Sequence, residues 1–149
     1  MRVKFISERV KAIPEELLQY SIETSVLTPN NEYVVFALCT MCGEPWYLLC
    51  DDYYQADNID SFPRYYPAML FDVVDAVHSK YWVEYQRIDE YVDNEPEVTN
   101  YSFLEFAQDP YFYGELLEAR DENYSKVFNR YKLLMETEEL VGAVECSRD

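Results

Sequence analysis

The stretch Tyr33-Val-Val-Phe-Ala-Leu-Cys-Thr-Met-Cys-Gly-Glu-Pro-Trp-Tyr-Leu-Leu-Cys50 decides the fold. Two apolar runs, 33–40 and 46–50, flank the turn sequence Cys42-Gly43-Glu44-Pro45. Continuous apolar runs of this length are typical of strands that are buried on both faces. Glycine and proline between two such runs indicate a tight connection. We therefore expect a β-hairpin over about 33–50 at the centre of the protein.

Further elements are predicted on both sides of the hairpin. Val3–Ile6 is a candidate first strand, and residues 79–88 alternate between apolar and polar side chains with the period of a strand. A helix is expected over about Pro14–Thr24, because proline suits the first helical position and carboxylates suit the first turn. An apolar stripe at helical spacing predicts a long C-terminal helix over about 111–137.

These elements define an α+β fold class. We expect a small antiparallel sheet built on the central hairpin (about 33–50) plus strand 79–88, packed against an N-terminal helix and a long C-terminal helix. The chain has 149 residues, of which 49% are hydrophobic, so residues 1–149 should form a single domain. Asp51–Tyr66 has no period and is predicted to be a long ordered loop. Pro67 is expected to open a short helix whose inward-facing residues are Met69, Leu70, Val73, Val74 and Val77.

The charge of the chain restricts its partners. Its 29 acidic and 12 basic side chains give a formal net charge of −17. Such a chain repels nucleic acid and anionic membranes, so we expect no direct nucleic-acid binding and no membrane partner. Charged residues follow Met1 instead of an apolar leader, and no apolar run reaches the ~20 residues that span a bilayer. The sequence therefore predicts a cytoplasmic protein with reduced cysteines.

The predicted loop and the residues that follow it contain the candidate binding residues. No Lys or Arg occurs between Lys11 and Arg64, so local ion pairing is not expected in this stretch. Tyrosine is enriched at protein interfaces, because its ring is rigid and its hydroxyl tolerates water. A solvated acidic face, with tyrosines that cover a core edge, is the alternative interpretation. The candidate residues are Asp51, Asp52, Tyr53, Tyr54, Asp57, Asp60, Tyr65 and Tyr66.

Two alternatives involve metal or enzymatic chemistry. Asp51 and Asp52 end a predicted strand, where carboxylates can bind a hard cation or act as an acid–base pair, although the EF-hand pattern is absent. Cys39 and Cys42 have the spacing of half a zinc knuckle, and buried free cysteines in a core hairpin also fit this pattern. His78 is the sole histidine, and nothing in the sequence places it in a triad. We expect no cofactor.

In composition the chain resembles small acidic bacterial immunity and inhibitor proteins. The resemblance implies a protein that holds a basic toxin by charge and aromatic contact. An inhibitor of this kind can occupy a site of its partner that is meant for nucleic acid, because carboxylates imitate phosphates. The leading hypothesis is therefore a non-enzymatic acidic binding protein that engages a cationic protein surface. A metal-dependent or hydrolytic enzyme is the first alternative, and a structural zinc protein is the second.

Overall fold

The predicted hairpin forms the middle of a five-stranded antiparallel sheet in the computed structural model. The structure describes the backbone of residues 1–86 and 99–146, and the side chains of residues 1–86 and 99–138. In this sheet the strands follow the order β5-β4-β3-β8-β7, and a second sheet has the order β2-β1-β6. The strands are β1 (Arg2–Phe5), β2 (Glu32–Val34), β3 (Ala37–Met41), β4 (Glu44–Leu49), β5 (Arg64–Pro67), β6 (Phe71–Asp75), β7 (Trp82–Gln86) and β8 (Thr99–Phe103).

The turn of the hairpin is shorter than the sequence indicates. Met41 lies opposite Glu44, so only Cys42 and Gly43 connect β3 to β4. Both connecting residues have positive φ angles, 52° and 75°, as a type I′ turn requires. This turn matches the right-handed twist of the strands, and it allows Glu44 and Pro45 to belong to β4.

The first apolar run of the hairpin contributes to both sheets. β2 pairs with β1, and β3 pairs with β4 and β8. Val35 and Phe36, each 1% exposed, carry the chain from one sheet to the other. The Phe36 carbonyl accepts a hydrogen bond from the buried Ser102 hydroxyl at 3.1 Å. The Phe36 carbonyl between the two sheets is therefore hydrogen-bonded inside the core, where an unpaired carbonyl would cost free energy.

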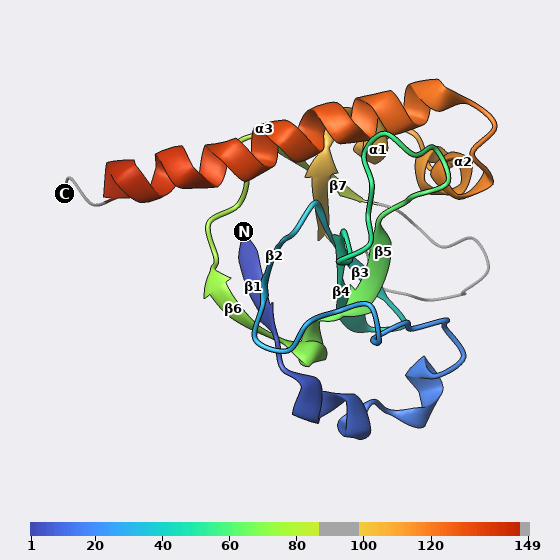
Figure 1. The fold of residues 1–149 in the computed structure, drawn as a ribbon, viewed down its shortest axis with the longest axis vertical. Coiled ribbons are helices and arrows are strands. Elements are labelled where there is room, and N and C mark those ends of the chain that lie inside the picture. The colour runs from blue at the N-terminus through green and yellow to red at the C-terminus, as the bar shows by residue number, and fades with distance from the viewer. Residues whose placement is uncertain (87–98, 147–149) are drawn as a thin grey trace.

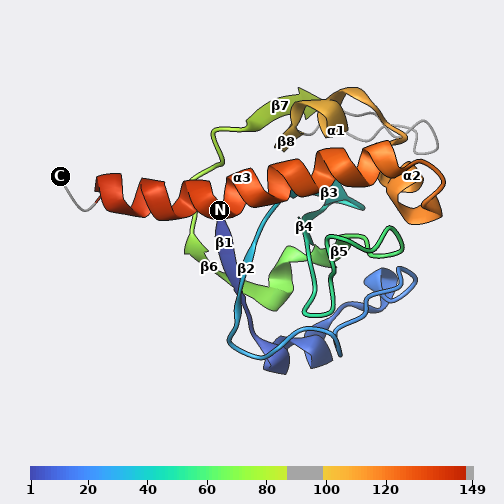
Figure 2. The same ribbon diagram turned by 45° about the horizontal axis from the view of Figure 1, so that its top comes forward.

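Three α-helices complete the α+β fold. They are α1 (Leu104–Gln108), α2 (Phe112–Glu118) and α3 (Glu122–Cys146). α3 runs along one side of the molecule, and its C-terminal end extends beyond the sheets (Figures 1 and 2). The fully buried Phe128 of α3 contacts the rings of Phe36 and Phe103 at 5.3 and 6.3 Å between centroids. These aromatic contacts dock α3 on the five-stranded sheet.

The long C-terminal helix is confirmed, but its predicted N-terminal turns are a separate helix. Ala119 has a left-handed φ of 52° and ends α2. Asp121 then accepts a hydrogen bond from the Asn123 backbone N–H at 2.9 Å, which supports a new helix start. The expected pair between Glu122 and Lys126 is present at 3.0 Å.

The predicted N-terminal helix is wrong in type. Instead of an α-helix over Pro14–Thr24, the structure has two 3₁₀ helices, Ser7–Ala12 and Glu15–Leu17. Leu17 is buried, whereas Leu18 is 62% exposed. One buried side chain gives an α-helix too narrow an apolar face, and most helical stability comes from packing such a face.

The segment after Pro67 is also corrected. One 3₁₀ turn, Ala68–Leu70, leads into strand β6, where an α-helix was predicted. Val73 and Val74 are 50% and 49% exposed, so they do not face inward. β6 lies at the edge of the three-stranded sheet, where β-branched residues are favoured and burial is incomplete.

Candidate functional site

The candidate loop connects β4 to β5 and is fixed to the helices. The Tyr54 hydroxyl donates to Asn129 Oδ1 of α3 at 2.6 Å. Asn129 Nδ2 in turn donates to the Ala56 carbonyl at 3.2 Å. Near the end of the loop, the Tyr113 hydroxyl of α2 donates to the Pro63 carbonyl at 3.0 Å. These bonds hold the acidic loop in one position on α2 and α3.

Asp51 closes the base of the loop with an ion pair. Its Oδ2 accepts from Arg64 Nε at 3.1 Å, and its Oδ1 accepts from the Tyr53 backbone N–H at 2.9 Å. The Asp51 side chain is 8% exposed. The expectation that local ion pairing is absent is therefore wrong at this position, because Arg64, which ends the stretch without basic residues, pairs with the first carboxylate of the loop. Arg64 is the site residue that the sequence analysis missed.

Asp52 ties the loop to the segment before β2. Its carboxylate accepts from the Tyr33 hydroxyl at 2.7 Å and from the Thr28 hydroxyl at 2.5 Å. The Tyr33 oxygen itself accepts from the Thr28 backbone N–H at 2.8 Å. Burial, together with the bond to Asp52, raises the pKa of Tyr33 to about 12. Asp52 therefore anchors the chain with a small polar network.

The two tyrosines at the end of the predicted loop lie in strand β5. Tyr66 is fully buried, and its hydroxyl donates to the Glu23 carbonyl at 2.8 Å. The Tyr65 ring lies 4.7 Å from the Tyr113 ring, and burial raises the pKa of Tyr65 well above its usual value. Both residues pair in register with β4, so they are structural and do not belong to an exposed loop surface.

Four of the eight candidate residues are exposed, and one of them, Asp52, already accepts hydrogen bonds from Tyr33 and Thr28. Tyr53 is 72% exposed, and Asp57 and Asp60 are also on the surface. The Asp60 backbone N–H is held by Asn58 Oδ1 at 2.9 Å. The structure thus places one aromatic ring and two carboxylates on a loop that the other candidate residues hold in place.

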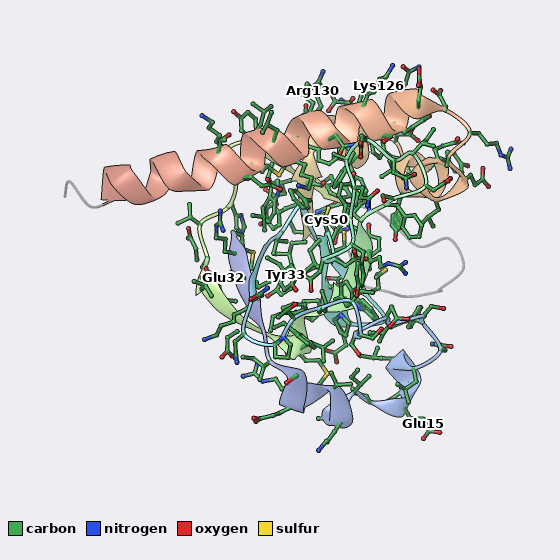
Figure 3. The ribbon with its side chains drawn as sticks, in the orientation of Figure 1. Glu15, Glu32, Tyr33, Cys50, Lys126 and Arg130 are labelled. Atoms are coloured by element: carbon green, nitrogen blue, oxygen red, sulfur yellow. The ribbon has the colours of Figure 1, made fainter. Side chains whose placement is uncertain are left out.

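A groove of about 510 Å³ lies beside this loop, between β2 and α3. Asp51 and Tyr54 line it, together with Lys132 and Glu136 of α3, which pair at 2.5 Å. Cys50 also lines the groove and lies between the sheets and α3 (Figure 3). Burial raises the pKa of the Cys50 thiol, so it stays protonated and is a poor nucleophile.

The two cysteines considered for zinc have separate surroundings. Cys39 is buried, with the Tyr85 hydroxyl 3.4 Å from its sulfur. Cys42 is exposed on the hairpin turn, with the Tyr20 hydroxyl 2.5 Å from its sulfur. Among the described side chains, those of residues 1–86 and 99–138, no three His, Cys, Asp or Glu groups come together in a way that could hold a metal ion. His78 packs on the Tyr101 ring at 4.5 Å.

Comparisons with known proteins give no functional assignment for this site. No family model, curated protein or solved structure matches the chain. Over the part of the chain that the structure describes, no helix has the length and apolar content needed to cross a bilayer. What the site does must therefore follow from its own residues.

Proposed function

We propose that the chain is a non-enzymatic acidic binding protein that engages a cationic protein surface. An inhibitor or immunity-type role is the most concrete form of this proposal. The observation that carries it is the exposure of Tyr53, Asp57 and Asp60 on a loop that is fixed at both ends.

A fixed loop suits binding because little conformational entropy remains to be lost on association. The exposed Tyr53 ring supplies contact area with few rotatable bonds. Asp57 and Asp60 supply negative potential, and the formal net charge of −17 extends it over the whole chain. Such a field speeds the encounter with a cationic partner and weakens as salt rises.

The candidate residues divide into two roles in this proposal. Asp51 and Asp52 hold the loop, together with Tyr54 at α3 and with Tyr65 and Tyr66 in β5. Tyr53, Asp57 and Asp60 would contact the partner. The same division weakens the hydrolytic alternative, because each strand-end carboxylate already accepts two hydrogen bonds within the protein.

The test combines capture of a partner with kinetics. The immobilised protein is exposed to a native extract at low salt, and the retained protein is purified for surface plasmon resonance. Asp57→Asn with Asp60→Asn should slow association, and the loss should shrink at high salt. Tyr53→Ala should instead speed dissociation, as loss of an aromatic anchor does.

A matched control removes the same charge elsewhere. Glu15→Gln with Glu16→Gln changes two exposed carboxylates on the second 3₁₀ helix, far from the loop (Figure 3). This variant should bind like the unmodified protein. If the retained partner is acidic, or if its kinetics respond equally to the loop and control variants, the proposed surface is wrong.

A further inference from the structure

A second recess lies on the helical side of the molecule. α1, α2 and α3 surround a pocket of about 350 Å³. It shares no lining residue with the groove beside the acidic loop. Figure 2 shows the three helices gathered near the N-terminal end of α3.

The walls of this pocket are apolar and aromatic. Phe112 of α2 is 3% exposed, and its ring meets the Tyr124 ring edge-on at 5.1 Å. Val127 follows one turn after Tyr124 on the same side of α3 and also lines the pocket. These groups offer an alkyl chain a surface to pack against, and aromatic rings also attract cations.

Two carboxylates from the α1 segment stand at the pocket. Asp109 is held by the Tyr111 backbone N–H at 2.9 Å and, more loosely, by the Tyr124 hydroxyl at 3.4 Å. Glu105 Oε1 accepts from Arg130 Nη2 at 3.4 Å, from a guanidinium on the side of α3 that faces away from the sheets (Figure 3). Among the described residues, no Lys or Arg lines the pocket itself.

One oxygen of the two carboxylates, Glu105 and Asp109, forms no hydrogen bond with the described residues. Glu105 Oε2 is buried and forms no hydrogen bond of normal geometry with the described residues, although the Glu105 carboxylate interacts with the Tyr131 hydroxyl, whose pKa is raised by burial and by this carboxylate. A buried carboxylate oxygen without a donor costs free energy, and a charged donor that reached it would remove that cost. The pocket thus combines apolar walls with two carboxylates, Glu105 and Asp109, and Glu105 has one oxygen without a hydrogen bond.

We propose that this pocket receives a lysine or arginine side chain of a partner protein. The alkyl stem would pack against Phe112, Tyr124 and Val127, and the charged end would reach Glu105 and Asp109. Both side chains combine an apolar stem with cationic donors, which is the chemistry that the pocket complements. The identity of the partner rests on the proposed function, whereas the affinity of the pocket for a cationic side chain does not.

Blocked amino acids test the pocket directly by ¹H–¹⁵N NMR titration. N-acetyl-arginine amide and N-acetyl-lysine amide should shift resonances of α1, α2 and the first turns of α3 in a saturable way. N-acetyl-citrulline amide has the shape of the arginine probe without its charge, and N-acetyl-norleucine amide supplies the alkyl stem alone. Both neutral probes should bind about tenfold more weakly or worse, because the charge-assisted bonds are missing.

Variants of the two pocket carboxylates test whether the probes bind in this pocket. Glu105→Gln and Asp109→Asn should each weaken the cationic probes severalfold and leave the neutral probes unchanged. Glu118→Gln is the matched control, since it removes one exposed carboxylate of α2 that does not line the pocket. The ¹⁵N spectrum of each variant shows whether it is folded, and Asp109→Asn serves if Glu105→Gln disturbs the contact with Arg130.

The outcomes separate this inference from the proposed function. Equal binding of citrulline and arginine probes, or no saturable shift near the pocket, would overturn the pocket proposal. If a cationic partner is found but ignores Glu105→Gln and Asp109→Asn, the pocket proposal fails and the binding function stands. If the cationic probes bind but no partner is found, the pocket stands and the function fails.

Discussion

Replacing Asp51 with Asn should lower the free energy of unfolding by about 3 kcal/mol, although the two side chains have nearly the same shape. The change removes the charge-assisted bond to Arg64, and hydrogen bonds to charged groups contribute ~1.5–3 kcal/mol. The new amide group also turns an N–H toward a donor, either Arg64 Nε or the Tyr53 backbone. A buried group left without its partner costs a further ~1–3 kcal/mol.

The expected loss of about 3 kcal/mol is smaller than the sum of these two contributions, because Arg64 is 37% exposed and can be partly rehydrated. In a chain of this size each kcal/mol corresponds to roughly 2–4 °C in melting temperature, so the variant should melt about 6–12 °C lower. Circular dichroism melts and urea unfolding measure the change. Asp57→Asn is the control, and it should stay within about ±0.5 kcal/mol because its carboxylate is on the surface.

A double-mutant cycle with Arg64→Gln assigns the loss to the pair. If the ion pair is responsible, Asp51→Asn should cost much less in the Arg64→Gln background than alone. Should Asp51→Asn melt within 1 °C of the unmodified protein, about the range of a surface change, the carboxylate does not hold the loop. The division between holding and contacting residues would then be wrong.

Three further predictions follow from burial. Cys42 should react quickly with a thiol reagent in the folded protein, and buried Cys39 should react only after unfolding, which peptide mass spectrometry can show. Half-buried Cys50 should react slowly, because its raised pKa keeps the thiol protonated; labelling of Cys50 as fast as that of Cys42 would contradict this reasoning. Because the Tyr33 pKa is raised to about 12, against about 10 in an unfolded chain, its contribution to stability is present below pH ~10 and is lost as pH rises toward 12. Urea unfolding at a series of alkaline pH values measures that loss, and Tyr33→Phe should reduce its slope. Phe128→Ala should cost about 3–5 kcal/mol in urea unfolding, since it empties a fully buried site, and a loss below ~1 kcal/mol would show that α3 is not docked through this ring.

The elements that the sequence predicts well are those whose pattern of apolar residues matches their burial. The hairpin strands are apolar on both faces, and β7 alternates cleanly, so local pattern and tertiary environment agree. Apolar valines after Pro67 fit a helix or a strand equally, and only pairing with β1 decides for the strand. Tyr65 and Tyr66 lie between two prolines, which indicates a loop, yet pairing with β4 makes them strand residues.

The candidate site shows the same limit. Acidic residues and tyrosines in the loop are visible in the sequence, but which of them point outward depends on Arg64 and Asn129, which are 13 and 75 residues from the groups they bind. The pocket between the helices is harder to predict from the sequence than the acidic loop. Glu105 and Asp109 are four residues apart, but their relation to Tyr124 on another helix follows only from how the helices pack.

The position of residues 32–41 between the two sheets has a consequence for local unfolding of the protein. The same short run supplies a strand to each sheet, with only Val35 and Phe36 between the two. Neither sheet can separate from the other without pulling its neighbour's strand out of register. Partial opening of one sheet is therefore coupled to loss of the other, and amide protons in both sheets should exchange with solvent through one shared opening event.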